Sequence, residues 1–344
     1  MAWKNLTQTS LADAFIYQHE AITELDDLNQ LIDWKSIESQ MNTINNNPMG
    51  EKAWPPLVMF KILLLQSFYN LSDPACEKQL ARDLLFRRFV NLSLTDPVPD
   101  HSTIWRFRNT LNKNGILQKL LDNINHQLNS QGLIIKNGQA SIIDATVIQA
   151  KNNRPNKNAK GENTQDKDDS YNVKTASDGK RKTTYGFKAH ANVDEDGFIL
   201  SQTLTTGSLH DSNVFEDLLT GSEEAVYADS AYKSQKHDQL LKSKDIQNRV
   251  LHRAYRNKPL SEQQKSHNKL ASQVRYVVER TFGVLKKYYG LGQARYMGIA
   301  RNQARLTIIC IAHNLKRAVN IQRSYSYGLG VSVSKIWKTP TKIN

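Results

Sequence analysis

Three acidic residues occupy positions where a carboxylate is costly unless it binds something. Asp144 lies within the apolar segment 142–147, Asp229 ends the apolar segment 225–228, and Glu279 lies in a helical pattern of apolar residues. A lone aspartate in a strand is usually structural, but three buried charges in one domain need partners. Mg²⁺ prefers a few carboxylates and keeps waters and phosphate oxygens as its other ligands. The three residues together therefore indicate a metal site for phosphodiester chemistry, in which paired ions activate one oxygen and stabilise the other.

Cations flank the third carboxylate on the same predicted helix. Arg275, Glu279 and Lys286 recur at i, i+4 and i+11, so at 100° per residue they fall within about 40° of one another. A carboxylate between two cations can bind a metal ion and a DNA phosphate together, and we expect the neighbouring Arg280 and Lys287 to bind phosphate as well. The alternative is an ordinary ion pair between Arg275 and Glu279, which contributes a few tenths of a kcal/mol. Spacing alone leaves both interpretations open.

Charge is distributed very unevenly along the chain. The 344 residues include 46 Lys and Arg against 33 Asp and Glu, a net charge of +13. Residues 1–240 carry 25 basic and 30 acidic residues, whereas residues 241–344 carry 21 basic and 3 acidic residues. A surplus concentrated in this way is typical of a protein that binds the phosphate backbone of nucleic acid. A solvated basic tail is the plainer alternative, and an anionic membrane is disfavoured because no basic amphipathic helix has an aromatic-rich face.

Composition excludes several other classes of protein. Hydrophobic residues make up 39% of the chain and aromatic residues 8%, which is enough for a folded core. The longest apolar stretch, residues 57–65, is interrupted by Lys61 and is too short to span a bilayer, and the N-terminus lacks the pattern of a signal peptide. Two cysteines, Cys76 and Cys310, cannot form a disulfide scaffold or a cysteine zinc site. We therefore expect a cytoplasmic protein associated with the nucleoid.

Residues 1–132 are predicted to form a helical domain for DNA binding or dimerisation. Pro55 and Pro56 stand where prolines begin helices. Asp73 is predicted to cap a helix that runs to about residue 90, and Ser102 is predicted to cap another that runs to residue 112.

The helix over residues 102–112 has two interpretations. It carries Trp105, Arg106, Arg108 and Asn109, which could contact bases and phosphates if the helix enters a DNA groove. It could equally be a helix that packs on the core and leaves its two arginines at the surface. The sequence favours neither.

From residue 138 the pattern changes to alternating strands and helices. Strands are predicted over residues 141–148, 185–193, 198–205, 225–229 and 246–251. Helices are predicted over residues 212–219, 234–242, 261–289 and 302–318. This order predicts an α/β domain over residues 138–320, in which helices flank a mixed sheet. Residues 321–344 are predicted to be a loosely ordered basic tail.

Two acidic groups are assigned structural roles from the sequence. Residues 151–182 form a lysine-rich polar stretch without an apolar period, so Asp166, Asp168 and Asp169 within it are expected to be solvated in a loop. Asp211 could line the edge of the metal site together with His210. It could also cap the next helix, which is the interpretation we favour.

Five short segments together resemble the DDE motif regions of bacterial insertion-sequence transposases, and more narrowly the family-five insertion-sequence group. The resemblance extends over about residues 45–320. The segments are Ile-Ile-Asp-Ala-Thr at 142–146, Gly-Ser-Leu-His-Asp at 207–211, Tyr-Ala-Asp-Ser-Ala-Tyr at 227–232, Pro-Leu-Ser-Glu at 259–262 and Arg-Tyr-Val-Val-Glu-Arg at 275–280. The family's helix pattern is Tyr, two residues, Arg, three residues, Glu, six residues, Lys. The chain matches it except that Ser272 replaces the tyrosine.

The resemblance implies a ribonuclease H-like fold in which Asp144, Asp229 and Glu279 hold two Mg²⁺ ions, for which Mn²⁺ could substitute. The implied reaction cuts a strand at the transposon end, after which the freed 3′-OH attacks target DNA. Arg275 and Lys286 would hold phosphates near the scissile bond. The implied partners are the terminal inverted repeats and target DNA, and action on two ends implies a homodimer or a higher oligomer. The interval between Asp229 and Glu279 is too short for an inserted β-domain.

Two other functions remain as alternatives. One is a ribonuclease H-like nuclease that cuts DNA without joining it. The other is a transposase-derived regulator that binds DNA without catalysis, although a pure binding protein gains nothing from buried carboxylates. Inverted repeats next to the gene would favour transposition, and DNA binding without nicking would favour the regulator.

Overall fold

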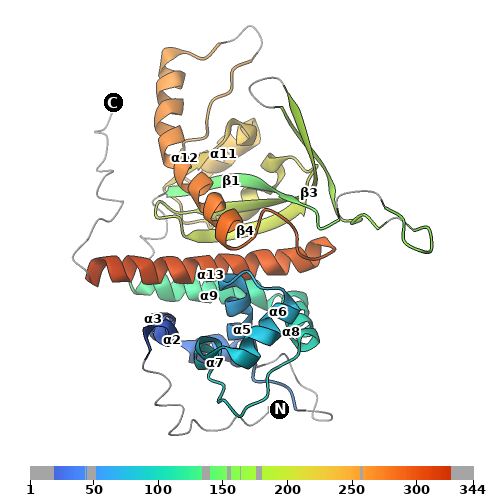
Figure 1. The fold of residues 1–344 in the computed structure, drawn as a ribbon. Helices are drawn as coiled ribbons and strands as arrows, with labels where there is room; N and C mark the ends of the chain where they lie inside the picture. Colours follow the sequence, from blue (N-terminus) through green and yellow to red (C-terminus); the bar gives the residue numbers. More distant parts are fainter. Residues whose placement is uncertain are drawn as a thin grey trace. The chain divides into compact units, whose positions relative to one another are not determined.

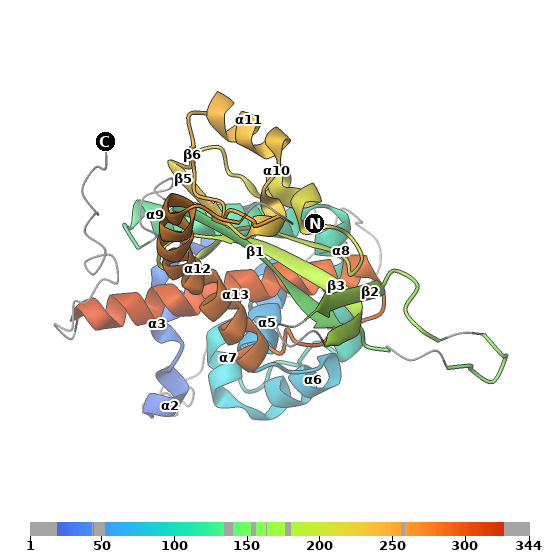
Figure 2. The same ribbon diagram turned by 90° about the horizontal axis from the view of Figure 1, so that it is seen from above.

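The computed structural model describes residues 19–42, 44, 52–133, 140–152, 156–162, 164–175, 180–255 and 259–326. Two compact units emerge from its internal contacts. One unit contains the described residues up to Leu128 together with Thr307–Val319, and the other contains those of Asn129–Leu306 and those that follow Asn320. Figures 1 and 2 show the first as a group of helices and the second as a sheet with helices. Each unit is described separately below.

The first unit is helical, as its sequence predicts. Its central helix is α5, which begins at Pro56 as expected and buries nearly every side chain along its length. The Lys61 ammonium on α5 is also buried, donates to Asn29 Oδ1 at 2.8 Å and lies over the Trp34 ring. The helices of this unit are α2 (Glu20–Thr23), α3 (Asp26–Leu31), α4 (Trp34–Ser39), α5 (Pro56–Phe68), α6 (Asp73–Arg82), α7 (Leu84–Val90), α8 (His101–Lys113) and α9 (Ile116–Ser130).

Two predicted helix caps in this unit are wrong by one or two residues. Ser72, not Asp73, caps α6, because its hydroxyl accepts a hydrogen bond from the Ala75 amide. Asp100, not Ser102, caps α8, because its carboxylate accepts from the Thr103 amide at 2.8 Å. The helix predicted to continue to residue 90 is broken at Asp83, which caps α7. At the start of both α6 and α8, two residues close together in the sequence are able to cap the helix, and local sequence does not choose between them.

Asp73 has a tertiary role instead of a capping role. Arg108 on α8 is only 2% exposed, and its guanidinium donates to both carboxylate oxygens of Asp73 at 2.8 and 2.9 Å. Gln66 on α5 accepts a further hydrogen bond from Arg108 at 3.0 Å. Because Arg108 faces the core and Arg106 is exposed, only one of the two arginines on α8 is available at the surface.

The second unit is built on a six-stranded mixed sheet. Its strand order is β2-β3-β1-β5-β6, and β4 also pairs with β3. The pairs formed by β3 are antiparallel, whereas β1, β5 and β6 run parallel. This is the mixed sheet that the order of strands and helices predicts, and it agrees with the ribonuclease H-like fold that the resemblance implies. The strands are β1 (Ala140–Gln149), β2 (Ser170–Thr175), β3 (Arg181–Val193), β4 (Ile199–Thr206), β5 (Ala225–Ala228) and β6 (Gln247–Asn248).

Helices and short 3₁₀ turns complete this unit. A buried cluster that includes Ile143, Val226, Phe215 and Leu241 joins one face of the sheet to α10 and α11. The long helix α12 contacts β1, β3 and β5. These elements are η1 (Asp211–Val214), α10 (Phe215–Leu218), η2 (Ser230–Tyr232), α11 (Gln235–Ser243), α12 (Glu262–Tyr288) and α13 (Ile299–Ser326).

The lysine-rich stretch 151–182 is not the featureless loop that its composition predicts. It contains β2, and β3 begins at Arg181, four residues earlier than expected. Its described acidic residues are also ordered. The carboxylate of Asp166 accepts from the Gly298 amide at 2.7 Å, and that of Asp168 accepts from the Ile299 amide at 2.9 Å. These two aspartates therefore satisfy the first amides of α13, which the sequence cannot show because they lie more than 130 residues away.

Asp169 is buried beside these two capping carboxylates, and both of its own carboxylate oxygens lack a hydrogen-bond partner among the described residues. Burial, together with the charges of Asp166 and Asp168, raises the pKa of Asp169 to about 7. A raised folded-state pKa means that the folded protein holds this proton while the unfolded chain has released it. Stability is therefore lost as pH rises from about 4 to about 7.

Replacement of Asp169 with asparagine is expected to remove this penalty. The melting temperature of Asp169→Asn should exceed that of the wild type by more at pH 8 than at pH 5, as measured by thermal unfolding. Asp245→Asn is the control, because it removes an exposed carboxylate whose charge does not act on Asp169. A difference from the wild type that is equal at both pH values would show that Asp169 does not retain its proton in the fold.

The last helix is longer than its sequence predicts. It extends to Ser326, six residues into the segment expected to be a tail, while residues 327–344 lie outside the described part of the chain. No helix among the described residues is both long enough and apolar enough to cross a membrane.

Candidate active site

Two of the three predicted carboxylates lie on neighbouring parallel strands. Ile143 on β1 pairs with Ala228 on β5, so Asp144 and Asp229 are the next residues along the two strands. β5 ends at Ala228, and Asp229 caps the 3₁₀ turn η2 with its side chain. Ile143 of β1 and Val226 and Ala228 of β5 lie in one buried cluster, so a shift of the register would disturb the packing of this cluster.

The field around Tyr232 shows that these carboxylates gather at one place. The Tyr232 side chain is fully buried, and its hydroxyl has no hydrogen-bond partner among the described residues. Burial raises its pKa well above the usual value, and the charges of Asp144, Asp211 and Asp229 raise it further, while Arg275 opposes them. Three carboxylates and one guanidinium therefore act on a single buried hydroxyl.

Helix α12 supplies the guanidinium. Figure 1 shows α12 running across the sheet, and Arg275 lies on its buried side at 8% exposure. Arg275 Nη2 donates to Asp144 Oδ2 at 3.1 Å, and the Ala145 amide donates to Asp144 Oδ1 at 2.8 Å. Among the described residues, the ion pair of Arg275 thus joins it to Asp144 on β1, not to Glu279 on its own helix.

Glu279 lies one turn after Arg275 and is exposed. Lys286, Arg280 and Lys287 are exposed as well, so α12 carries its remaining predicted cations at the surface. The end of α12 is fixed by Arg305 of α13. The Arg305 guanidinium donates to the carbonyl oxygens of Tyr289, Gly290 and Gln293, at 3.1, 2.8 and 2.8 Å, in the order named.

The strand β1 also holds the segment that follows α12. The Gln149 amide donates to Gly292 O at 3.0 Å, and the Ala294 amide donates to Gln149 O at 2.7 Å. The helix that carries Glu279 is therefore tied to the strand that carries Asp144, both through Arg275 and at its end.

The donor atoms fit Mg²⁺ in kind, since hard cations favour carboxylate oxygens. Their arrangement here is not a metal cluster: no group of three or more His, Cys, Asp or Glu side chains in the described part of the chain is arranged to hold an ion. Both oxygens of Asp144 already accept hydrogen bonds, and Asp229 Oδ1 accepts from the Ser230 amide. Each of these carboxylate oxygens keeps a second lone pair, and Glu279 is exposed in this structure.

Asp211 does not cap the helix that follows it, as its position in the sequence led us to expect. The cap of η1 is His210, whose ring accepts a hydrogen bond from the Ser212 amide. Asp211 instead accepts at 2.9 Å from the ammonium of Lys188, a buried residue on β3 that also donates to Leu209 O.

A second buried group beside this pair, His190, hydrogen-bonds to Thr205 and has its pKa lowered, chiefly by burial. Neither Lys188 nor His190 was predicted from the sequence as a residue of the site. Polar residues that alternate within the apolar segment 187–193 were the available signal.

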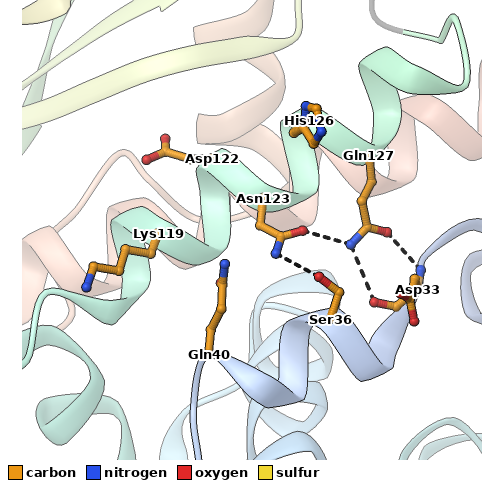
Figure 3. Close-up of a pocket in the computed structure, with 8 residues that line it drawn as sticks. All are labelled: Asp33, Ser36, Gln40, Lys119, Asp122, Asn123, His126 and Gln127. Carbon is orange, nitrogen blue, oxygen red and sulfur yellow. Dashed lines mark hydrogen bonds between the residues drawn. The ribbon is translucent and has the colours of Figure 1, made fainter. Parts of the chain in front are cut away.

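A pocket in the helical unit contains none of these residues. Figure 3 shows that it lies between α4 and α9 and that its polar side chains bond to one another. Gln127 accepts from the Asp33 amide at 2.8 Å, and Asn123 donates to Ser36 Oγ at 3.0 Å. These contacts join two helices, so we assign the pocket a structural role.

Comparison with known families agrees with the geometry. A family model described as a transposase DDE domain matches residues 136–315, which is more than half of the 344 residues and includes Asp144, Asp229 and Glu279. A second family model, described as a transposase domain, matches residues 12–110. The chain is a member of the DDE transposase family.

Among solved structures, the transposase is similar to the piggyBac transposase in a synaptic complex with hairpin DNA, determined by cryo-EM. The two chains are 12% identical, the alignment covers 98% of this chain and 85% of that one, and the TM-score is 0.41. The likeness is distant, and no residue role is transferred from it.

Proposed function

We propose that this transposase cuts DNA at the terminal inverted repeats of an insertion sequence and joins the freed 3′ end to target DNA. The observation that carries the proposal is the placement of Asp144 and Asp229 at the same level of two parallel strands, with α12, the helix that carries Glu279, packed against both strands. Ligand and catalytic sites of open α/β sheets typically lie at this end of parallel strands.

Asp144, Asp229 and Glu279 are the residues proposed to hold two Mg²⁺ ions, or Mn²⁺ in their place. When bound, such ions would supply activation of the attacking oxygen and stabilisation of the leaving oxygen. The protein's own contribution is positional. β1 and β5 fix two carboxylates on a rigid sheet, and α12 brings the third on a long helix fixed at its far end by Arg305.

Arg275 is proposed to exchange partners during this process. While Asp144 is bonded to the guanidinium, the pair is neutral and largely buried. Once Asp144 becomes a metal ligand, Arg275 needs another anion, because a buried guanidinium without one is costly. A phosphate of the bound strand provides that anion, and Arg forms bidentate hydrogen bonds with phosphate readily.

The DNA is proposed to follow the exposed side of α12. Lys286, Lys287 and Arg280 lie at this surface, and residues 241–344 carry all of the surplus positive charge, with 21 basic against 3 acidic residues. Cations in this arrangement bind the backbone without reading sequence. Recognition of the terminal repeats is proposed for the helical unit, and action on two ends requires at least a homodimer at the DNA in the cytoplasm.

Strand transfer separates this function from that of a nuclease. A duplex that carries the element's end with a free 3′-OH should be joined to a supercoiled plasmid in the presence of Mg²⁺ or Mn²⁺. The same duplex with a 3′-deoxy end should give no joined product, because the attacking oxygen is missing. Joined molecules are counted by sequencing across the junctions.

Each result of this experiment decides between the proposed function and an alternative. Plasmid nicking without joining would identify a nuclease. Specific binding to the end without nicking or joining would identify a DNA-binding regulator.

A further inference from the structure

A two-stranded ribbon extends the sheet on the side of β3. It consists of β2 and the first five residues of β3, paired antiparallel from Tyr171 opposite Tyr185 to Thr175 opposite Arg181. β1 pairs with β3 only from Gly186 onward, so the ribbon continues beyond the end of β1. Figure 1 shows it rising away from the rest of the sheet.

The base of the ribbon is tightly fixed. A methyl group on Gly186 would overlap the Ile148 carbonyl oxygen, and one on Gly207 would lie 2.5 Å from Gly186 O and 2.6 Å from Ser170 O. Three segments of backbone therefore cross at a point where only glycine fits. Asn172 adds a hydrogen bond to Gly207 O at 3.1 Å.

The two tyrosines at the base strengthen this attachment. Tyr185 donates to the carbonyl oxygens of Asp166 and Asp169, at 2.7 and 3.2 Å. Its ring packs edge-on against Tyr171, with ring centroids 4.8 Å apart. The ribbon is thus a projection of the sheet that is braced at its base.

The ribbon also exposes large side chains that are unusual together on a hairpin surrounded only by solvent. Tyr171 and Val173 are 55% and 56% exposed, and they lie on the same face as Thr183 and Arg181 because directly paired residues share a face. Lys182 is exposed on the opposite face of the ribbon, and Lys180 is exposed directly before β3. The combination of an aromatic ring, a β-branched side chain and adjacent cations is typical of a surface that contacts a polyanion.

We propose that this β2–β3 ribbon is a DNA-binding arm that lies in a groove of the duplex near the active site. The inference rests on the proposed function and adds a contact surface to it. A two-stranded ribbon fits the width of the major groove of B-DNA. Arg181 and Lys182 contact phosphates, while Tyr171 and Val173 meet sugar and base edges.

The positive charge of the ribbon favours DNA, and not a second copy of this chain, as its partner. Every charged side chain described on the ribbon is positive: Lys180, Arg181 and Lys182. Pairing of two such ribbons edge to edge would bring like charges together, which destabilises strand association.

The first test compares DNA binding by the wild type and by the double variant Arg181→Ala/Lys182→Ala. Binding of a duplex that carries the element's end is measured over a range of salt concentrations, with EDTA present so that no cleavage occurs. Loss of two phosphate contacts should lower affinity about 10-fold or more at low salt and reduce the slope of log K against log salt by about 1–2. An unchanged slope and affinity would overturn the proposal.

The control is Lys242→Ala/Lys244→Ala, which removes two exposed charges from the region of α11 at the opposite edge of the sheet. This control should change affinity much less, since a general loss of positive charge acts equally in both variants. The design also separates this inference from the proposed function. If the wild type neither binds nor cuts the element's end, the proposed function is refuted. If the wild type binds the end and the ribbon variant binds it equally well, only the proposal of a DNA-binding arm is refuted.

A photoreactive phenylalanine analogue in place of Tyr171 identifies directly which molecule contacts the ribbon. Irradiation with the duplex present should give a protein–DNA adduct whose yield falls when unlabelled duplex competes. A protein–protein adduct in its place would assign the ribbon to contact between copies of the chain and would overturn DNA as its partner. The absence of any adduct while the duplex is fully bound would place Tyr171 away from DNA.

Discussion

Asp144→Asn is expected to abolish strand cleavage, with a loss of at least about a thousandfold in rate, equivalent to about 4 kcal/mol of transition-state stabilisation. Asparagine preserves the shape of the side chain, and its one carbonyl oxygen can still accept from the Ala145 amide, while the hydrogen bond from Arg275 is lost, so the fold should be retained. It lacks the negative charge that a divalent ion requires. Cleavage of an end-labelled duplex in Mg²⁺ measures the rate, and binding in EDTA should change by no more than about threefold.

A matched control removes an acid that plays no part in the proposed site. Asp245 is exposed and has a positive φ, a backbone conformation that asparagine tolerates well. Asp245→Asn should therefore cut DNA at the rate of the wild type. Equal cleavage by Asp144→Asn and the wild type would exclude Asp144 as a metal ligand.

Arg108→Ala is expected to cause the largest loss of stability. Its guanidinium bridges Asp73 and Gln66 at 2% exposure, so truncation leaves the carboxylate of Asp73 buried beside an empty space. Removal of one partner from a buried ion pair costs about 3–5 kcal/mol. The melting temperature should fall by roughly 10 °C for a protein of this size. Thermal unfolding monitored by circular dichroism measures the change.

Two further variants test the cause of this effect. Arg106→Ala, on the exposed side of the same helix, should alter stability by less than about 0.5 kcal/mol. Asp73→Asn/Arg108→Met should be more stable than Arg108→Ala, because it removes the carboxylate charge together with the cation that opposes it and fills more of the side-chain volume. A double variant as unstable as the single one would show that packing volume, not charge, explains the loss.

The elements that position the site are well determined by local sequence. The alternation of apolar residues around Asp144, and the short apolar run that ends at Asp229, predicted both strands and therefore the edge at which the two carboxylates meet. A helix was also predicted over residues 261–289, and α12 begins at Glu262, directly after Ser261, which caps it with a full capping box. Such signals act over a few residues, which is why they can be read from one sequence.

The errors concern residues whose partners are distant in the sequence. Asp166 and Asp168 were predicted to be solvated, yet they satisfy the first amides of α13. Asp211 was predicted to cap a helix, yet it pairs with Lys188. β2 was missed because its only apolar side chains, Tyr171 and Val173, face solvent rather than a core.

The contact between Arg275 and Asp144 marks the limit of prediction within the site. Helical spacing placed Arg275 and Glu279 on one side of α12, and a pairing along the helix was as consistent with it as a role in phosphate binding. The structure instead joins Arg275 to a strand 131 residues away in the sequence. Which of two carboxylates Arg275 pairs with is decided by tertiary structure, and no local sequence pattern encodes it.

The most direct test of the central claim is cleavage of a duplex that spans the boundary between the element and its flanking DNA. The wild-type transposase is incubated with this duplex in Mg²⁺, in Mn²⁺ and in EDTA, and the ends are mapped to the nucleotide. The proposed function predicts a nick at the boundary that leaves a 3′-OH and forms only when one of the two metals is present. Specific binding at the boundary without a nick in either metal would contradict it and leave a DNA-binding protein without catalysis.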